Sequence, residues 1–334
     1  MGVMRRMCAG DRALGRPGRG ARAAALPHPP EPRPRARAKI LGTIIRRAVR
    51  PAHITVRPDS PARWRTMSTP TPTPTSTPDP LDRARLCAEL RRMGVREGSA
   101  LIVHASLSAF GPVLGGADTV VGALLDCLSP AGTLVVPTFT PEVSDPHPRA
   151  AEPTSDKVAA ARDGIPLFHD ALPTSMGAVP TAVLAHPDRL RSSHPQASVA
   201  AVGPAARSVT GRQPLAYALG TGSPFEALHD LDADILLLGV GHNRNSFLHH
   251  AESRVPHHRR KLRRFPHLTD GQRVWVEARD VGDDNGTHFP RVGQEFAATG
   301  QVRTHTIGRA ECRLMNSRAL TRFATRLLGE LLAP

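Results

Sequence analysis

Residues 101–140 read LIVHASLSAFGPVLGGADTVVGALLDCLSPAGTLVVPTFT, and this stretch decides the fold class. Asp118 and Asp126 are its only charged residues. The pattern divides into a strand over Ala100–Val103, a loop rich in serine and glycine, a helix over Asp118–Leu128 and a strand over Thr133–Val136. Both strands are apolar on both faces, which is typical of a parallel sheet covered by helices. The stretch therefore predicts a βαβ unit.

The segments after this unit extend it into one domain. Asp234–Val240 gives the strongest signal for a buried strand in the chain. Residues near Arg273–Ala278 and Gln301–Ile307 alternate between polar and apolar side chains, as antiparallel strands do. Helices are expected after an N-cap at Asp79 and near residues 176–185, 246–253 and 317–332. We predict a three-layer α/β/α domain over residues 79–334, with a mixed, largely parallel sheet and no internal repeats.

Two polar segments are expected to be irregular. Residues 141–175 contain prolines and show no clear period, so we expect a long loop or lid over the site. The basic run Arg259–Arg264 is interpreted as a solvated loop rather than as a binding patch.

The net charge of +15 belongs mostly to the N-terminal segment. Residues 1–80 hold 16 of the 44 lysines and arginines, 4 of the 29 aspartates and glutamates and 14 of the 33 prolines. Such a segment buries too little apolar surface to offset its ordering entropy. We expect a disordered, basic, proline-rich tail over residues 1–78, in which residues 1–66 are a misassigned start before Met67 or a real disordered arm. The near-neutral remainder gives little electrostatic reason to bind nucleic acid.

The four cysteines, Cys8, Cys87, Cys127 and Cys312, lie far apart and form no Cys-x-x-Cys pair. This spacing argues against a zinc ribbon or a disulfide framework and fits a reducing cytosol. No uninterrupted apolar run approaches the roughly 20 residues that span a bilayer. We therefore expect a cytoplasmic protein that does not enter a membrane.

A candidate reactive histidine lies in the stretch RSSHPQASVAAVG, residues 191–203. Pro195 biases His194 towards an extended backbone. Ser198 and the small residues up to Gly203 are interpreted as the start of a closely packed helix. Such a turn can hold an imidazole beside hydroxyls and backbone N–H groups, although an ordinary histidine in a strand-to-helix loop has the same sequence.

Six segments resemble the aminoglycoside 3-N-acetyltransferase family, in the family's order and at similar spacing, over roughly residues 80–330. They are Val103–Ser108 with Gly115-Gly116, Gly132–Thr140, Thr174–Pro180, Arg191–Gly203, Gly222–Phe225, and Leu236–Gly241 leading to Leu248–Glu252. The resemblance implies transfer of an acetyl group from acetyl-CoA to an amine, in a domain of the antibiotic N-acetyltransferase type.

The resemblance also implies a general base and its partner. The family's reactive histidine falls in the Ser-x-His-Pro context, so His194 is the expected base, which removes the proton from the attacking amine. Glu226, just after Gly222–Phe225, is expected to hold the imidazole in the correct tautomer. The alternative for Glu226 is a glutamate in the first turn of a helix, which the helix dipole favours.

A second imidazole and carboxylate lie three residues apart on one predicted helix. His249 and Glu252 match the family's Leu-His-x-x-Glu pattern, which places this helix face near the substrate cleft. A cationic amine needs carboxylates, so Glu252 and Asp170, together with His249, are expected to bind the substrate. The alternative for His249 and Glu252 is a buried pair that joins the helix to the sheet.

The same region is rich in histidine but lacks the spacing of a metal site. No pair among its histidines forms His-Glu-x-x-His, so we expect no catalytic metal; these histidines are His249, His250, His257 and His258.

The acyl donor is expected to bind the loop over residues 104–116, which follows a buried strand and opens a helix. The chain has no Walker-type loop and no Gly-x-Gly-x-x-Gly motif, which argues against a protein that binds nucleotide triphosphates or dinucleotides. By resemblance, the acetyl-CoA channel is lined by seven residues: His104, Ser106, Leu107, Ser108, Thr138, Arg191 and Ser192.

These features predict an acetyl-CoA-dependent N-acetyltransferase, a monomer or homodimer that acts on an aminoglycoside or a related amino-sugar by direct transfer in a ternary complex. One alternative keeps the fold but acylates another amine, with a different acyl-CoA. A second alternative is a nucleic-acid-binding protein that acts through the basic tail. Ser246, where family members often carry threonine, and the loop 141–163, which lacks a matching aromatic residue, leave the identity of the amine open.

Overall fold

The computed structural model describes residues 80–150, 155–282 and 285–334. The predicted tail, Met67, Cys8 and the predicted N-cap Asp79 lie outside these residues. The first helix, α1 (Arg83–Met93), begins after Asp82, whose carboxylate accepts a hydrogen bond from the backbone N–H of Arg85 at 2.8 Å. The expected helix is therefore present, with its N-cap three residues later than predicted.

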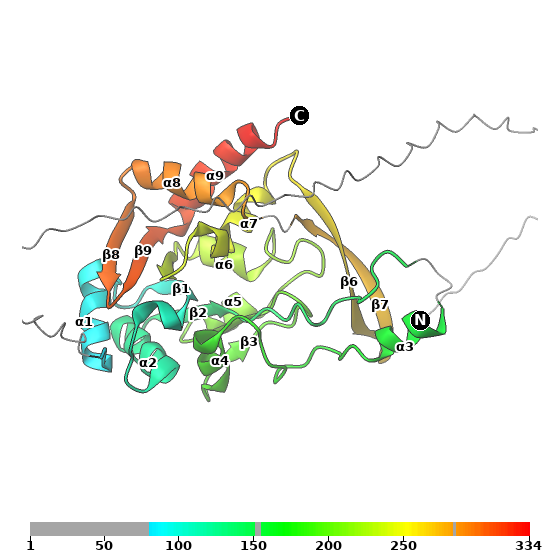
Figure 1. Ribbon diagram of the computed structural model, residues 1–334, viewed down its shortest axis with the longest axis horizontal. Coiled ribbons are helices and arrows are strands. Elements are labelled where there is room, and N and C mark those ends of the chain that lie inside the picture. Colours follow the sequence, from blue (N-terminus) through cyan, green and yellow to red (C-terminus); the bar gives the residue numbers. More distant parts are fainter. Residues whose placement is uncertain (1–79, 151–154, 283–284) are drawn as a thin grey trace, which may run out of the picture. The chain divides into compact units, whose positions relative to one another are not determined.

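A seven-stranded mixed sheet forms the centre of the described domain (Figure 1). The three middle strands are parallel, since β1 pairs in parallel with β2 on one side and with β5 on the other. The outer pairings are antiparallel. The strand order is β3 (Leu190–Arg191), β4 (Val199–Val202), β2 (Thr133–Pro137), β1 (Ala100–Ala105), β5 (Asp234–Leu238), β9 (Ala310–Asn316) and β8 (Val302–Ile307).

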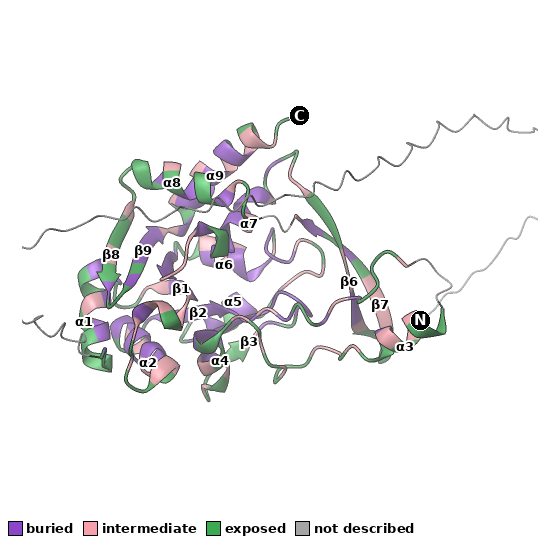
Figure 2. Ribbon diagram, viewed as in Figure 1, coloured by how far each residue is buried: buried purple, intermediate pink, exposed green. Residues whose placement is uncertain are grey.

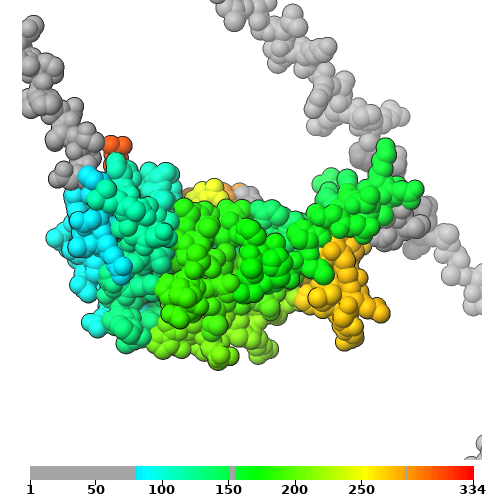
Figure 3. Space-filling view, turned by 90° about the horizontal axis from the view of Figure 1, so that it is seen from below, coloured from blue at the N-terminus to red at the C-terminus, as the bar shows by residue number. Residues whose placement is uncertain are grey.

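The middle strands are apolar on both faces because each face packs against a layer of helices. In β1, Leu101 and Val103 point into one apolar cluster and Ile102 into the other. On the first face lie α1, α2 (Gly116–Leu128) and α4 (Ala178–Ala185), which are neighbours in Figure 3. On the second face lie α5 (Ala206–Thr210), α6 (Pro224–Asp230), α7 (Phe247–Glu252), α8 (Phe289–Ala298) and α9 (Ser317–Leu331). The predicted three-layer α/β/α architecture is confirmed, and Figure 2 shows its buried strands between helices with exposed outer surfaces.

A separate two-stranded hairpin corrects the prediction for the basic run. Residues predicted as a solvated loop form the start of β6 (Arg260–Thr269), which pairs with β7 (Gln272–Val281). The charges are tolerated because carboxylates lie beside them: Arg263 donates to Asp280 at 2.5 Å. Phe265 is buried against Val143, which attaches the hairpin to the loop after β2.

The prediction of a helix after Ser198 is wrong. Residues 199–202 form β4, which pairs antiparallel with β2, so that Ala200 faces Val136 across the ladder. The small side chains fit a strand that is fully covered on both faces. Gly203 ends the strand with φ of 126°, where a Cβ would lie 2.2 Å from the carbonyl oxygen of Gly132.

In its described residues, the predicted loop over residues 141–175 contains the helix α3 (Asp156–Asp163). Arg162 of this helix forms a buried ion pair with Asp145 at 2.8 Å, which ties the helix to the chain just after β2. Burial would raise the pKa of Asp145, but the hydrogen bonds from Arg162 and the backbone hold it below its usual value. The described part of the segment is therefore not uniformly irregular.

Two further features concern the cysteines and the membrane prediction. Cys87 and Cys127 are buried free thiols of α1 and α2 whose sulfur atoms lie 2.9 Å apart. Among the described residues, no helix combines the length and the apolar character that crossing a bilayer requires.

Candidate active site

A large cavity opens at the carboxyl ends of the three parallel strands. It has a volume of about 960 Å³ and is lined by the ends of β1 and β2, the residues after β5, the loop before α2 and the first turn of α4. Ligands bind at this edge of open α/β sheets because backbone N–H groups of loops and helix starts are exposed there. Gly239 lets the chain pass closely, since a Cβ at its φ of 65° would lie 2.3 Å from the Cβ of Ala109.

Four of the residues predicted to bind the acyl donor line this cavity: His104, Ser106, Leu107 and Ser108. The loop is held in shape locally, with the hydroxyls of Ser106 and Ser108 3.2 Å apart. Leu107 begins the 3-10 helix η1 (Leu107–Phe110). Hydroxyls, backbone amides and apolar side chains thus face one cavity, which suits a pantetheine arm with its amides and methylenes.

His104 joins the cavity to the start of α7. Its Nε2 accepts a hydrogen bond from the backbone N–H of Ser246 at 3.1 Å, so its proton lies on Nδ1. Nδ1 is buried and has no hydrogen-bond partner among the described residues. Burial, with a smaller effect of the nearby His242, lowers the pKa of His104 to about 3, so the ring is neutral at physiological pH.

The other three predicted donor-binding residues do not line the cavity. The hydroxyl of buried Thr138 contacts Ser198 at 3.1 Å. Arg191 donates hydrogen bonds to backbone carbonyls, including that of Thr138 at 2.9 Å, and burial lowers its pKa to about 10. Ser192 accepts from the backbone N–H of Val199 at 2.8 Å. These side chains fix the backbone around β3 and β4.

His194 is 1% exposed, and both of its ring nitrogens bind the backbone. Nδ1 accepts from the N–H groups of Gln196 and Ala197, each at 3.0 Å. Nε2 therefore carries the proton and donates to the carbonyl of Leu215 at 3.2 Å. The ring packs edge-on against Phe265, with centroids 5.3 Å apart. Burial lowers the pKa of His194 to about 4.

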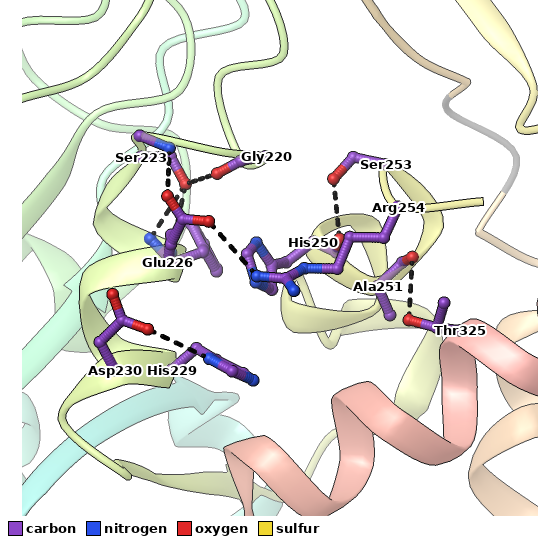
Figure 4. A network of polar contacts seen from close by, with 12 residues as sticks. Gly220, Ser223, Glu226, His229, Asp230, His250, Ala251, Ser253, Arg254 and Thr325 are labelled. Carbon is purple, nitrogen blue, oxygen red and sulfur yellow. Dashed lines mark hydrogen bonds and ion pairs between the residues drawn. The ribbon is translucent and has the colours of Figure 1, made fainter. Parts of the chain in front are cut away.

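Glu226 lies in the first turn of α6, and no hydrogen bond joins it to His194. Its carboxylate accepts from the backbone N–H of Gly222 at 2.6 Å and pairs with Arg254 at 3.4 Å (Figure 4). Ser223 caps the same helix end by accepting from the N–H of Phe225 at 3.2 Å. The observed contacts of Glu226 are those of the alternative that the sequence left open, a helix-start glutamate.

The imidazole and carboxylate that the structure does bring together are those of α7. His249 Nδ1 lies 3.4 Å from Glu252 Oε2, and the His249 side chain is 12% exposed. Glu252 is fully buried and accepts from Arg259 at 2.8 Å and 3.0 Å. Burial would raise the pKa of Glu252, but His249 and Arg259 hold it below its usual value, so the carboxylate is ionised.

The ring of Phe289 packs beside both His249 and Arg259. The His249 ring meets it edge-on at 4.8 Å, and the Arg259 guanidinium lies 5.7 Å from its centroid. Arg259 and Phe289 were missed in the sequence. Arg259 follows Glu252 by seven residues, but it was grouped with a run interpreted as solvated.

The contacts of Asp170 are with neither His194 nor His249. It is exposed and pairs with Arg189 at 2.5 Å, while its backbone carbonyl accepts from Arg191 at 3.0 Å. Within the described ranges, no three histidine, cysteine, aspartate or glutamate side chains gather closely enough to hold a metal ion.

The arrangement offers a cavity of about 960 Å³ and, on α7, an imidazole beside an ionised carboxylate. Neither His194 nor His249 lines the cavity itself. However, His104, which lines the cavity, accepts a hydrogen bond from the backbone N–H of Ser246, the N-cap of the helix that carries His249. An imidazole in this setting can accept a proton on the nitrogen that faces away from the carboxylate.

Comparisons with known proteins agree with this chemistry. The family model described as aminoglycoside 3-N-acetyltransferase matches residues 102–329. The chain is 31% identical over 249 residues to the SPbeta prophage-derived aminoglycoside N(3')-acetyltransferase-like protein YokD of Bacillus subtilis (strain 168), covering 73% of this chain and 91% of that protein. The crystal structure of YokD superposes with a TM-score of 0.70, over 75% of this chain and 93% of that one.

Two further relatives extend the match. Aminoglycoside N(3)-acetyltransferase III of Pseudomonas aeruginosa is 32% identical over 254 residues, which cover 75% of this chain and 94% of that protein. The solved structure of AAC-IIIb in a binary complex with CoASH is 29% identical and has a TM-score of 0.67, over 75% of this chain and 97% of that chain.

Proposed function

Because the chain belongs to the aminoglycoside 3-N-acetyltransferase family, we propose that it transfers the acetyl group of acetyl-CoA to an amino group, of the 3-N type, on an aminoglycoside or a related amino-sugar. The chain is an acyltransferase. The single observation that carries the proposal is the cavity at the ends of the parallel strands, in contact with the helix of the His249–Glu252 pair.

Acetyl-CoA is the donor in this proposal, and the cavity of about 960 Å³ would hold its pantetheine arm. The hydroxyls of Ser106 and Ser108 and the backbone amides of that loop suit the arm's amides. Gly116, at the start of α2, also lines the cavity. Arg244 also lines the cavity and carries the positive charge that a phosphate group needs.

We propose His249 as the general base. A base needs an uncommitted nitrogen that the substrate proton can reach. In His249, Nδ1 lies 3.4 Å from Glu252 Oε2 but makes no hydrogen bond with any described residue, and we propose Nε2 as the accepting atom. His194 stays the sequence-based prediction for this role, but its Nδ1 already accepts two backbone N–H groups and its Nε2 donates to Leu215.

The transfer would be direct, with both substrates bound. The amine nitrogen attacks the carbonyl carbon of the thioester while His249 Nε2 takes a proton from it. The carbon–sulfur bond breaks, coenzyme A leaves as the thiolate, and that sulfur takes up a proton. The ionised Glu252 stabilises the imidazolium that exists between these steps.

An assay of thiol release with acetyl-CoA and a panel of aminoglycosides tests this function. We expect release that depends on both substrates and a rise in the melting temperature with coenzyme A. No turnover together with no shift in the melting temperature would refute it. Coenzyme A binding without turnover of any aminoglycoside would redirect the acceptor to another amine and keep the acyltransferase chemistry.

A further inference from the structure

A groove between α6, the end of α7 and α9 is lined by seven residues, of which four are arginines. It has a volume of about 630 Å³ and shares no residue with the cavity at the ends of the parallel strands. His229 of α6 and Arg254 after α7 form one wall (Figure 4). No carboxylate is among the groove's lining residues.

The opposite wall is one face of α9. Arg318, Arg322 and Arg326 are spaced by four residues, and Thr321 and Thr325 lie between them at helical spacing, so all five share one face. Placing three like charges along one helix face is unfavourable without a counter-charge. We propose that this groove binds a phosphoryl group, as inorganic phosphate or as part of a small phosphorylated metabolite.

The groove also contains a buried hydroxyl that has no protein partner. Thr321 is 3% exposed, and its Oγ1 makes no hydrogen bond with any described residue. By contrast, the neighbouring Thr325 donates to the carbonyl of Ala251 at 3.3 Å. An unsatisfied buried hydroxyl is destabilising, and an anion in the groove would supply its missing acceptor.

Carboxylates outside the groove pair with three of its four arginines, and Arg318 also donates to the backbone carbonyls of His229 and Asp230. Arg254 lies 3.4 Å from Glu226, Arg326 lies 3.4 Å from Glu330, and Arg318 lies 3.7 Å from Asp232. His229 lies 3.4 Å from Asp230, which is largely exposed.

Arg322 makes no hydrogen bond or ion pair with the part of the chain that the structure describes, and it is exposed. The charged side chains that line the groove are therefore all guanidinium groups, and that of Arg322 has no carboxylate partner among the described residues. A phosphate suits these groups because guanidinium binds its oxygens through two parallel hydrogen bonds.

Calorimetric titration of the full chain with inorganic phosphate, at constant ionic strength, tests the proposal. We expect saturable binding at one site that Arg322→Glu weakens at least about tenfold, the usual effect of removing one charge-assisted contact. Arg207→Glu, at an exposed position of α5 outside the groove, makes the same change in net charge and is expected to leave the affinity within about twofold. No saturable binding, or equal weakening by both variants, would overturn the proposal.

Thr321→Val tests the buried hydroxyl without a change in charge, and weaker phosphate binding is expected. Titration with a sugar phosphate distinguishes the two sources of the anion, since binding much tighter than that of phosphate indicates a metabolite. Coenzyme A affinity is expected to be unchanged in Arg322→Glu. If that variant weakened coenzyme A binding and left phosphate binding intact, the groove would belong to the donor and the proposal would be wrong.

Discussion

The two imidazoles considered as bases, His194 and His249, occupy opposite kinds of environment. His194 lies in the loop before β4, with each ring nitrogen bound to a backbone group. His249 lies on α7, with one nitrogen 3.4 Å from an ionised carboxylate and part of its ring exposed. The His194 ring supplies hydrogen-bond partners for the backbone groups around it. The His249 ring lies beside a carboxylate, as the imidazole of a general base does.

We infer that the ring nitrogen left uncommitted after folding, rather than the motif around a histidine, determines whether the imidazole can act as a base.

His249→Ala is expected to lower turnover by about 10²–10⁴, the usual contribution of a positioned base. The melting temperature and the affinity for coenzyme A are expected to change little. Steady-state kinetics on purified protein measures the effect. If His194→Ala gave the larger loss per folded molecule and His249→Ala gave none, the base assignment would return to His194.

Glu252→Ala is expected to lower the free energy of unfolding by about 3–5 kcal/mol, because the Arg259 guanidinium then has lost the buried carboxylate with which it pairs. Chemical denaturation measures this change. Arg259→Met removes the other member of the pair and serves as the matched control. A cost for Glu252→Ala below about 1 kcal/mol would mean that the pair is solvated, as surface ion pairs are.

His194→Ala is expected to cost about 1–3 kcal/mol of stability, because the N–H groups of Gln196 and Ala197 lose their buried acceptor. Its turnover per folded molecule is expected to stay within about threefold of the parent protein. Denaturation and kinetics at a temperature where the variant is folded separate the two effects. His194→Asn, which retains a short acceptor, is expected to recover part of the stability.

The pH dependence of stability gives a further test of the same ring. The pKa of His194 is about 4 in the folded protein and about 6.5 in the unfolded chain, so only the unfolded chain gains the proton as the pH falls between these values. The free energy of unfolding should therefore fall from pH 6.5 to pH 4, and His194→Ala should reduce that slope by up to about 1.4 kcal/mol per pH unit. An unchanged slope would show that His194 titrates normally.

Glu226→Gln is expected to change stability by less than about 1 kcal/mol and to leave turnover unaltered. The amide oxygen can still accept from Gly222, and only the exposed pair with Arg254 is lost. Thermal denaturation and the thiol-release assay measure the two quantities. A large loss of turnover would restore Glu226 to the partner role predicted from the sequence.

The sheet could be predicted because its signal is local. Leu101–Val103 and Ile235–Leu238 are apolar on both faces, and burial between two helix layers is the environment that such strands require. The run over residues 199–202 was misread because small residues suit a packed helix as well as a covered strand, and only pairing with β2 separates the two.

The sequence predicts those parts of the site that depend only on the separation of two residues along one helix. His249 and Glu252 lie on one helix face by their separation of three residues, and the structure brings them together. By contrast, the partners of His194 depend on how the backbone turns at Gln196 and on the position of Leu215. The hairpin strand from Arg260 depends on Asp280, a later residue whose charge the local pattern does not include. Asp270-Gly271, at its turn, was a hairpin signal that the sequence did offer.

The central strand also sets the order in which the chain can fold as it is synthesised. Leu101 pairs with Asp234, and the strand beyond β5 comes from residues 310–316. While the ribosome is still producing the segment between these partners, β1 has an apolar, hydrogen-bonding edge with no neighbour. Non-local pairing of this kind slows folding, and an open edge attracts other chains. Truncated forms that end before β5 are therefore expected to aggregate, and the nascent chain to depend on chaperones until its C-terminal third emerges.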